Sequence, residues 1–256
     1  WRFSEDTMKR MYSEGLIVKK ENSLQQKYYK DDAIRTRKNV TSWWDEKFYT
    51  SGATKRLKEL MGGNYFDNPK PVELIVKMLK LHVRSNNDIV LDFFSGSSTT
   101  AHAVMQLNAE DGGSRKFVMV QLPEATPEDS EARKAGYKNI CEIGKERIRR
   151  AGEKIVKELR EQQEKKQEKL IEGDKKVANP EDLDIGFKVF ELDETNFTKW
   201  DPNTQDVEKS MMDQLTPIKA DRADEDAVYE IMLKYGVDLT MPIEELMLAG
   251  KKVFSL

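Results

Sequence analysis

The fold of this chain is decided by the stretch Asp88-Ile89-Val90-Leu91-Asp92-Phe93-Phe94-Ser95-Gly96-Ser97-Ser98-Thr99-Thr100-Ala101-His102-Ala103. Residues 89–91 form a short apolar run typical of a buried parallel strand, and Asp92 ends it. A small polar loop follows, and an alanine-rich, helix-favouring segment runs from Thr99 to about Leu107. This order predicts the first βα turn of a nucleotide-type site, where backbone N–H groups and the positive helix end face an anionic group.

The loop narrows the choice of ligand. A phosphate-binding P-loop would need a lysine before the Ser/Thr residues, and none is present, so a nucleoside triphosphate is disfavoured. The G-x-G-x-x-G pattern of dinucleotide-binding folds is not met either, because Gly96 is the only glycine in the loop. An ordinary βα turn capped by Ser or Thr explains the same residues and remains the alternative.

Residues 117–124 predict a second buried strand that ends in an acid, Glu124, about one βαβ repeat after the first. An acid at the end of the neighbouring strand can reach both hydroxyls of a ribose. The spacing therefore predicts that Asp92 and Glu124 belong to one site. The alternative is that Glu124 only caps a loop.

The composition excludes several classes of protein. Of the 256 residues 35% are charged and 38% hydrophobic, and no segment reaches the roughly 18 apolar residues of a membrane span. The single cysteine, Cys141, excludes an internal disulfide and fits a reducing cytoplasm, where we expect the protein to reside without touching a membrane. Since only His82 and His102 join it as soft ligands, no metal site is expected. The chain begins at Trp1 without an initiator methionine, so we expect a fragment of something longer.

The charge is unevenly distributed. Residues 1–70 carry 15 Lys/Arg and 10 Asp/Glu, a balance of +5, so a net charge of −3 leaves −8 for the remainder. A basic N-terminal part on an acidic remainder suits a protein that touches DNA with one part only. A chance imbalance of solvated charges explains the same numbers.

Periodicity and capping residues predict the other elements. Strands are expected at residues 16–18, 26–29 and 187–192, and helices at residues 4–14, 71–84, 131–169, 221–235 and 242–248, with a short helix inside 50–63. Met78 and its apolar neighbours Leu74, Ile75, Leu79 and Leu81 are expected in the core. The packed stripe of the long helix comprises Tyr137, Ile140, Ile143, Ile148, Ile155 and Leu159, and Gly136, Gly144 and Gly152 weaken that helix locally.

Two motifs resemble those of one enzyme class. The run from Asp92 to Ala101 is similar to the first motif of amino-methyltransferases that use S-adenosylmethionine, D-x-F-x-G-S-G-T-T, although Ser98 stands where the second glycine is usual. In that class the loop and its hydroxyls hold the methionine part of the cofactor, and a downstream acid holds the ribose. Asn68-Pro69-Lys70-Pro71 resembles the T-Q-K-P motif that precedes the first motif in β-class DNA amino-methyltransferases.

Longer runs resemble a narrower family, the Mod subunits of Type III restriction-modification systems. They are NPKPVELI, DFFSGSSTTAHAV, RKFVMVQLPE, ERIRRAG, DLDIGFKVFELDETNFTKWDP and YEIMLKYGVDLTMPIEE. The D-P-P-Y catalytic motif of that family is absent, because Asp201-Pro202-Asn203 lacks its second proline and its aromatic, and we interpret it as a turn. The resemblance therefore implies the cofactor-binding half of a DNA adenine-N6 methyltransferase, with no catalytic residue of its own.

The resemblance implies an α/β, Rossmann-like S-adenosylmethionine-dependent methyltransferase fold, partial and in the β-class motif order, with a small α+β C-terminal module. It divides the chain into the end of a DNA-contacting target-recognition region (1–64), the cofactor-binding core (65–172) and a C-terminal association module (173–256). The expected partners are double-stranded DNA, a second copy of the chain and the Res helicase-nuclease subunit. The cofactor-binding residues that it implies are Phe66, Asn68, Lys70, Pro71, Asp92, Phe93, Phe94, Ser95, Gly96, Ser98, Thr99, Thr100, Gln121 and Glu124.

The association role rests on apolar spacing within residues 184–256. Val228, Ile231, Met232 and Tyr235 are expected on one helix face, and Leu246 and Met247 on the face of the next helix. These faces can equally dock within the chain.

Two other functions remain open. A small-molecule or RNA methyltransferase would share residues 92–100 but not the order of the two motifs. A catalytically inert structural or DNA-binding subunit would have a decayed cofactor loop, with Ser98 as its mark.

Overall fold

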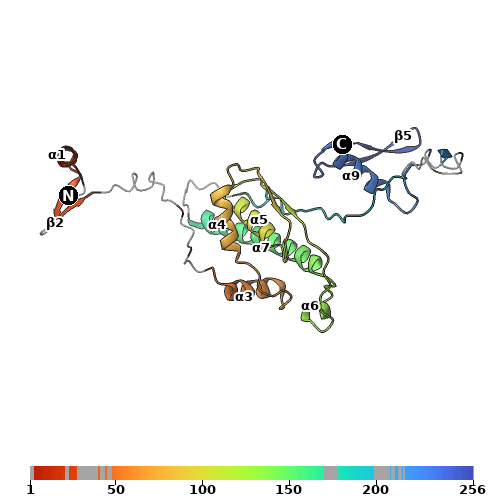
Figure 1. Ribbon diagram of the computed structural model, residues 1–256, viewed down its shortest axis with the longest axis horizontal. Coiled ribbons are helices and arrows are strands. Elements are labelled where there is room, and N and C mark those ends of the chain that lie inside the picture. Colours follow the sequence, from red (N-terminus) through yellow and green to blue (C-terminus); the bar gives the residue numbers. More distant parts are fainter. Residues whose placement is uncertain are drawn as a thin grey trace.

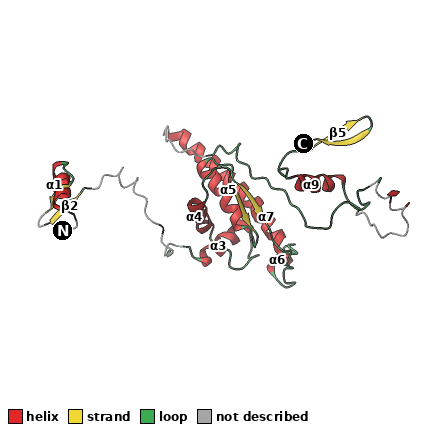
Figure 2. Cartoon of the chain, turned by 45° about the horizontal axis from the view of Figure 1, so that its top comes forward, coloured by secondary structure: helices red, strands yellow, loops and turns green. Residues whose placement is uncertain are grey.

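The computed structural model describes residues 3–20, 23–27, 40, 44, 48–169, 178–198, 208, 211–212, 215 and 217–255. Within these residues the fold is mixed α/β, with helices and three two-stranded sheets. Figures 1 and 2 show an N-terminal piece, a central body and a C-terminal piece along the chain. No helix in the described part is both long and apolar enough to cross a membrane.

The N-terminal piece is a helix and a hairpin. α1 (Glu5–Ser13) is capped by Ser4, whose hydroxyl accepts the N–H of Thr7, which confirms the predicted helix start. β1 (Ile17–Lys20) pairs antiparallel with β2 (Ser23–Gln26). The predicted strand pair is therefore present, but its second strand lies earlier than predicted, because Lys20 pairs with Ser23; residues 28 and 29 lie outside the described residues.

The central body begins with two helices and a βαβ unit. α3 (Thr50–Met61) and α4 (Val72–His82) precede β3 (Ile89–Asp92), α5 (Thr99–Asp111) and β4 (Lys116–Met119). The two strands run parallel, with Ile89 opposite Lys116 and Asp92 opposite Met119. Parallel neighbours need a crossover connection, and α5 supplies it. The strand, loop and helix predicted around Asp92 are thus confirmed.

The long helical segment is two helices rather than one. α6 (Glu131–Lys134) is separated from α7 (Ile140–Lys169) by a turn in which Gly136 has a φ of +98°. This positive φ ends the first helix, so the prediction of one helix over 131–169 is wrong at its start. α7 then runs without interruption through Gly144 and Gly152. Its predicted stripe is confirmed from residue 143 onward, since Ile143, Ile148, Ile155 and Leu159 are buried. Tyr137 precedes α7, and both Tyr137 and Ile140 are half-buried.

The core surrounds α5, which lies between α4 and α7 (Figure 1). One side of α5 packs on α7 through Ala101, Met105 and Ala109, with Ile148, Ala151, Ile155 and Leu159 as partners. The other side packs on α4 through Ala103, Val104 and Leu107, with Val76 and Leu79 as partners. A helix buried on two sides needs small apolar residues, which explains its alanines.

Two predictions of burial are wrong. Met78 and Leu81 are 43% and 42% exposed, because α4 turns Val76 and Leu79 inward instead. Strand β3 is covered on one face only, and Ile89 and Leu91 are 67% and 60% exposed.

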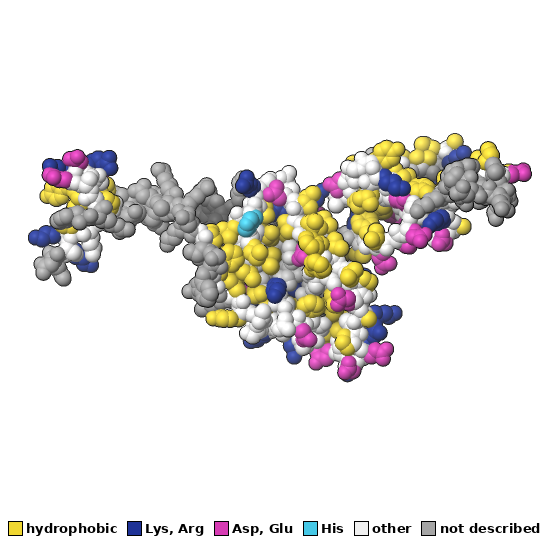
Figure 3. All heavy atoms as spheres, in the orientation of Figure 1, with side chains coloured by type: hydrophobic (Ala, Val, Ile, Leu, Met, Phe, Trp, Pro, Cys, Tyr) yellow, Lys and Arg dark blue, Asp and Glu magenta, His cyan; other side chains and the backbone are white. Residues whose placement is uncertain are grey.

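The uncovered face of the β3–β4 sheet is apolar. Val90, Phe117 and Met119 point into the helical core, while alternate residues on the other face remain accessible. The accessible residues, hereafter the open sheet face, are Ile89, Leu91, Val118 and Val120. Figure 3 shows hydrophobic side chains gathered over the central body. Parallel sheets are normally covered on both faces, so this surface is unusual for an isolated domain.

The C-terminal piece differs from the prediction in two elements. α9 (Asp224–Tyr235) is confirmed, but residues 242–248, predicted helical, include the strand β5 (Glu244–Leu248), which pairs antiparallel with β6 (Lys251–Ser255). The connecting Ala249 and Gly250 both have positive φ, a geometry that closes a two-residue hairpin.

The segment 187–192 is not a strand either. Its side chains contact α9 and the following loop instead of its backbone pairing in a sheet. Phe190 lies edge-on to Tyr229 at 5.1 Å between centroids, and Lys188 donates to the carbonyls of Leu239 and Met241. These contacts hold the segment in place without a ladder.

The apolar face predicted for the C-terminal helices is rearranged. Ala227 and Met232 form the buried side of α9, whereas Ile231 and Tyr235 are 43% and 82% exposed. Leu246 and Met247 belong to a strand and not to a helix.

The C-terminal piece touches the central body. Lys116 Nζ lies 2.6 Å from Asp238 Oδ2 and 3.0 Å from Thr240 Oγ1. Upstream of it, Leu183, Ile185 and Phe187 pack on the core cluster of α5 and α7. The domain limits at 64 and 172 remain predictions.

Candidate cofactor-binding site

Asp92 organises the loop at the carboxyl end of β3. Its Oδ2 accepts a hydrogen bond from Thr100 Oγ1 at 2.6 Å, and its Oδ1 accepts the N–H of Phe94 at 3.2 Å. The carboxylate therefore holds the end of the strand against the first turn of α5. This is the edge of a parallel sheet where ligands bind in open α/β folds.

The same loop is bonded to the chain that follows β4. Val120 N–H donates to the carbonyl of Asp92 at 2.8 Å, and Ser95 N–H donates to the carbonyl of Val120 at 3.2 Å. Gly96 N–H donates to Gln121 Oε1 at 2.7 Å. Gln121, which only the family resemblance implied, is thus brought to the loop, and its side-chain oxygen accepts one of the loop's N–H groups.

Ser98 adopts the conformation of the glycine that it replaces. Its φ and ψ are 58° and 41°, in the left-handed region, and it is the N-cap of α5. That region costs a residue with a Cβ about 1–2 kcal/mol. Ser98 therefore holds a backbone conformation that a glycine would adopt at little cost, and the loop residues Ser95, Ser97, Ser98 and Thr99 are buried.

The segment before α4 reaches the loop through Phe66. Gly96 has a φ of +50°, and a Cβ built there would lie 3.2 Å from Phe66 Cζ. The ring therefore closes one side of the loop and requires a glycine opposite it. Of the other predicted residues in this segment, Pro71 is buried at the start of α4, while Asn68 and Lys70 are exposed.

The remaining predicted residues, Phe93, Phe94 and Glu124, are exposed. Phe93 and Phe94 are 64% and 80% exposed and form a tilted ring pair at 5.2 Å. Strand β4 ends at Met119 and not near Glu124 as predicted, because the ladder to β3 ends with Asp92. Glu124 is exposed, and its carbonyl accepts the N–H of Ile140 at 3.0 Å, which ties it to the start of α7.

The sequence reading missed Arg147, which lies directly beneath the loop. Its Nη1 donates to Ser97 Oγ at 2.8 Å, to the Ser97 carbonyl at 3.3 Å and to Thr99 Oγ1 at 2.7 Å. Burial lowers the pKa of Arg147 to about 10, so it stays charged at neutral pH. A signal was present, because Arg147 continues the four-residue spacing of the buried Ile143, Ala151 and Ile155.

His102 is a half-buried residue near the loop. Its Nδ1 is buried and makes no hydrogen bond within the described part of the chain. Burial first, and then the charges of Arg147 and Lys154, lower the pKa of His102 to about 3. The ring is therefore neutral at neutral pH, and we assign it a packing role.

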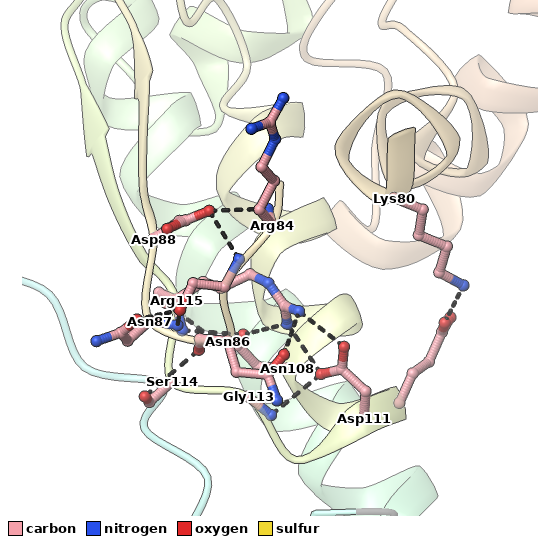
Figure 4. Close-up of polar contacts among 12 residues, drawn as sticks. Lys80, Arg84, Asn86, Asn87, Asp88, Asn108, Asp111, Gly113, Ser114 and Arg115 are labelled. Carbon is pink, nitrogen blue, oxygen red and sulfur yellow. Dashed lines mark hydrogen bonds and ion pairs between the residues drawn. The ribbon is translucent and has the colours of Figure 1, made fainter. Parts of the chain in front are cut away.

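A separate polar cluster lies at the opposite edge of the strand pair (Figure 4). Arg115 donates to both carboxylate oxygens of Asp111, at 2.9 and 2.8 Å, and to Asn108 Oδ1 and Asn86 Oδ1. The hydrogen bond from Arg115 holds the pKa of Asp111 below its ordinary value. The cluster joins the end of α5 to the starts of both strands, so we assign it to the scaffold.

A cavity of about 610 Å³ adjoins this cluster. It is bounded by the C-terminal half of α4, by α5 and by α7, with Lys80, Glu110 and Glu158 among its lining residues. None of the predicted cofactor residues lines it. It therefore does not belong to the candidate site.

The comparisons with known proteins agree on one family. A family model for DNA methylases matches residues 3–153. The Mod subunit of the Type III restriction-modification enzyme StyLTI from Salmonella typhimurium is 46% identical over 116 residues, 45% of this chain and 18% of that protein. The EcoPI Mod subunit of Escherichia phage P1 is 42% identical over 115 residues, again 45% and 18%. The Type II methyltransferase M.KpnI of Klebsiella pneumoniae is 34% identical over 143 residues, 56% of this chain and 34% of that protein.

This chain spans about a fifth of the length of the two Mod subunits and about a third of M.KpnI. The matched residues of the family model make up more than half of the chain and include the loop at Asp92, β4 and the first turns of α7. The chain therefore belongs to the DNA methylase family.

Proposed function

We propose that this chain is the cofactor-binding part of a site-specific DNA adenine-N6 methyltransferase of a Type III restriction-modification system. The observation that carries the proposal is the loop between β3 and α5, held by Asp92 on one side and by Gln121 after β4 on the other. The similarity to two Mod subunits supports the system, and the family supports the reaction class.

The residues present fit S-adenosylmethionine. The loop approaches its ligand with small residues, Gly96 is confined by Phe66, and α5 presents its positive end. When bound, the cofactor supplies a methyl group on a sulfonium, which is a good leaving group. The chain's own part is to bind and orient it, with the loop and Phe66 toward the methionine end and Glu124 toward the ribose.

The open sheet face supports the view that the site is completed from outside these residues. We infer that the part of the enzyme bearing the D-P-P-Y motif covers this face and adds strands at the edges of the strand pair, which completes a Rossmann-like sheet. The same part would place a flipped adenine beside the cofactor. The face is apolar, as a permanent interface requires. The short span of this chain relative to the Mod subunits leaves ample protein to cover it.

The wider assembly is also a proposal. Residues 1–64 would contact double-stranded DNA, and residues 173–256 would pair with a second copy or with the Res subunit. The exposed apolar side chains of the C-terminal piece support the pairing role of residues 173–256. They are Ile231, Leu233, Tyr235, Leu246, Met247 and Leu248.

Hydrogen exchange with and without S-adenosylhomocysteine tests the proposal. We expect slower exchange in the loop 94–100 and in residues 120–124, with the cluster around Arg115 unchanged. Unchanged exchange throughout would contradict the proposal and favour the inert structural subunit. Protection only around the cavity near Lys80 would place the ligand elsewhere.

A further inference from the structure

Arg147 is a buried cation whose Nη1 group donates to one short segment. The residue is 3% exposed, and its Nη1 makes three hydrogen bonds to Ser97 and Thr99. No carboxylate of the described residues pairs with it, and its Nε is buried without a partner. A buried charge without a counter-ion is costly, so a stabilising role in the core does not account for it.

The two residues that Arg147 binds flank Ser98. Ser98 holds a left-handed conformation that disfavours a residue with a Cβ by a factor of about 5–30. Such a conformation persists only where the surroundings fix it. Hydrogen bonds to the residue before and to the residue after Ser98 do this.

Gly144, one turn before Arg147 on α7, lies against the Ser98 side chain. A Cβ built on Gly144 would lie 2.6 Å from Ser98 Oγ and 3.4 Å from the Gly96 carbonyl. A Cβ at residue 144 would therefore displace Ser98 Oγ, whereas its distance to the Gly96 carbonyl is an ordinary van der Waals contact. The space that Gly144 leaves is filled by the Ser98 side chain. Residues 144 and 147 lie on one face of α7, three positions apart.

We propose that Arg147 is a positioning residue for the cofactor loop and that, together with Gly144, it holds Ser98 in the left-handed conformation on which the loop's shape depends. The identity of the ligand in this inference rests on the proposed function, whereas the contacts between Arg147 and the loop do not. A glycine at position 98 would adopt the left-handed conformation without support. Because this chain has serine there, contacts from α7 hold the conformation instead.

The test is a double-mutant cycle on the whole chain. Arg147→Met keeps the length and removes the donors, and we expect it to weaken S-adenosylhomocysteine binding about tenfold in calorimetry. Ser98→Gly makes the left-handed conformation easy. In the Arg147→Met background it should recover at least about threefold of the loss, because the loop no longer needs to be held. Arg149→Met, an exposed arginine on the same helix, should bind as the parent does.

Gly144→Ala gives an independent cycle. The added methyl group meets Ser98 Oγ, so the single variant should bind S-adenosylhomocysteine about tenfold more weakly, and Ser98→Gly should restore binding by removing that oxygen. Gly152→Ala is the matched control, because its Cβ would meet the side chain of Ile185 instead of the loop. Any loss it causes should not respond to Ser98→Gly.

Urea unfolding of the same variants separates this inference from the proposed function. If the parent binds no cofactor, the proposed function fails, and the positioning role is still measured by the coupling between residues 98 and 147 in unfolding. We expect Ser98→Gly to offset part of the stability lost in Arg147→Met. Additive effects of the two substitutions, in binding and in unfolding alike, would overturn the inference.

Discussion

Thr100 Oγ1 lies 2.6 Å from Asp92 Oδ2, a hydrogen bond that joins the last residue of β3 to the first turn of α5. The carboxylate accepts this bond and the N–H of Phe94 together, so the strand, the loop and the helix form one unit. The loop is therefore set by contacts within the chain before any ligand arrives, which is the condition for tight binding of a small molecule.

Replacing Thr100 with valine keeps the shape of the side chain and removes its hydroxyl. Asp92 loses its shortest partner, and we expect the free energy of unfolding to fall by about 1–3 kcal/mol. Urea denaturation measures this. Thr54→Val, which removes an exposed hydroxyl bonded to the Thr50 carbonyl within α3, should cost under about 0.5 kcal/mol. Equal losses in the two variants would show that the Asp92 contact is unimportant.

The neutral, half-buried His102 predicts loss of stability in mild acid. Its pKa is about 3 in the folded chain and 6.5 ordinarily, so the unfolded chain takes up a proton first as the pH falls. Its contribution is fully present above pH 6.5 and declines toward pH 3, by about 1 kcal/mol at pH 5.5. The change in unfolding free energy between pH 7 and 5.5 should shrink in His102→Leu. It should persist in His82→Leu, whose side chain is exposed at the end of α4.

Elements formed by contacts between residues close in the sequence could be predicted, and elements that depend on distant residues could not. The loop around Gly96 and the helix after it could be predicted, because turn chemistry and alanine content are local. The hairpin at Ala249 could not, because the short segment 242–248 was predicted to be a helix and Ala-Gly is a weaker turn signal than Asn-Gly. Exposure of Ile89 was missed because an apolar strand predicts two covering layers, and the described residues supply one.

Site residues followed the same rule. Asp92 could be singled out because it lies at the end of an apolar run, and Gln121 came only from the family resemblance. The parallel pairing brings the chain after β4 to the loop after Asp92. Arg147 belongs to a helix about 50 positions away, and its role depends on how α7 packs on the loop. In the sequence it is marked by its place in an apolar stripe and in the family-like run ERIRRAG, and neither shows which residues it contacts.

We predict that the chain transfers no methyl group to DNA by itself. It has no D-P-P-Y motif to hold the adenine and receive the N6 hydrogens, and its sheet face is open to water. Incubation with tritiated S-adenosylmethionine and an adenine-containing duplex should give counts equal to a blank. Incorporation above the blank, absent from a duplex without adenine, would mean that catalytic residues lie within these 256 positions.

The exposed apolar residues of α9 predict self-association. Ile231, Leu233 and Tyr235 are 43%, 67% and 82% exposed on one short helix. Sedimentation at tens of micromolar should show a dimer for the parent and a monomer when all three are replaced by lysine. Leu192→Lys, a change at a fully exposed leucine in the same piece, should leave the dimer intact. A monomeric parent would assign these side chains to another partner or to none.

The affinity of the chain for S-adenosylhomocysteine, measured by calorimetry for the parent, Glu124→Ala and Glu128→Ala, tests the central claim most directly. Glu124 follows β4 at the edge where the loop lies, and Glu128 is an exposed acid four residues further on. We predict that the parent binds, that Glu124→Ala loses roughly 1–3 kcal/mol because the ribose hydroxyls lose their acceptor, and that Glu128→Ala is unchanged. Equal binding by all three would contradict the placement of the ribose, and no binding by the parent would contradict the cofactor site itself.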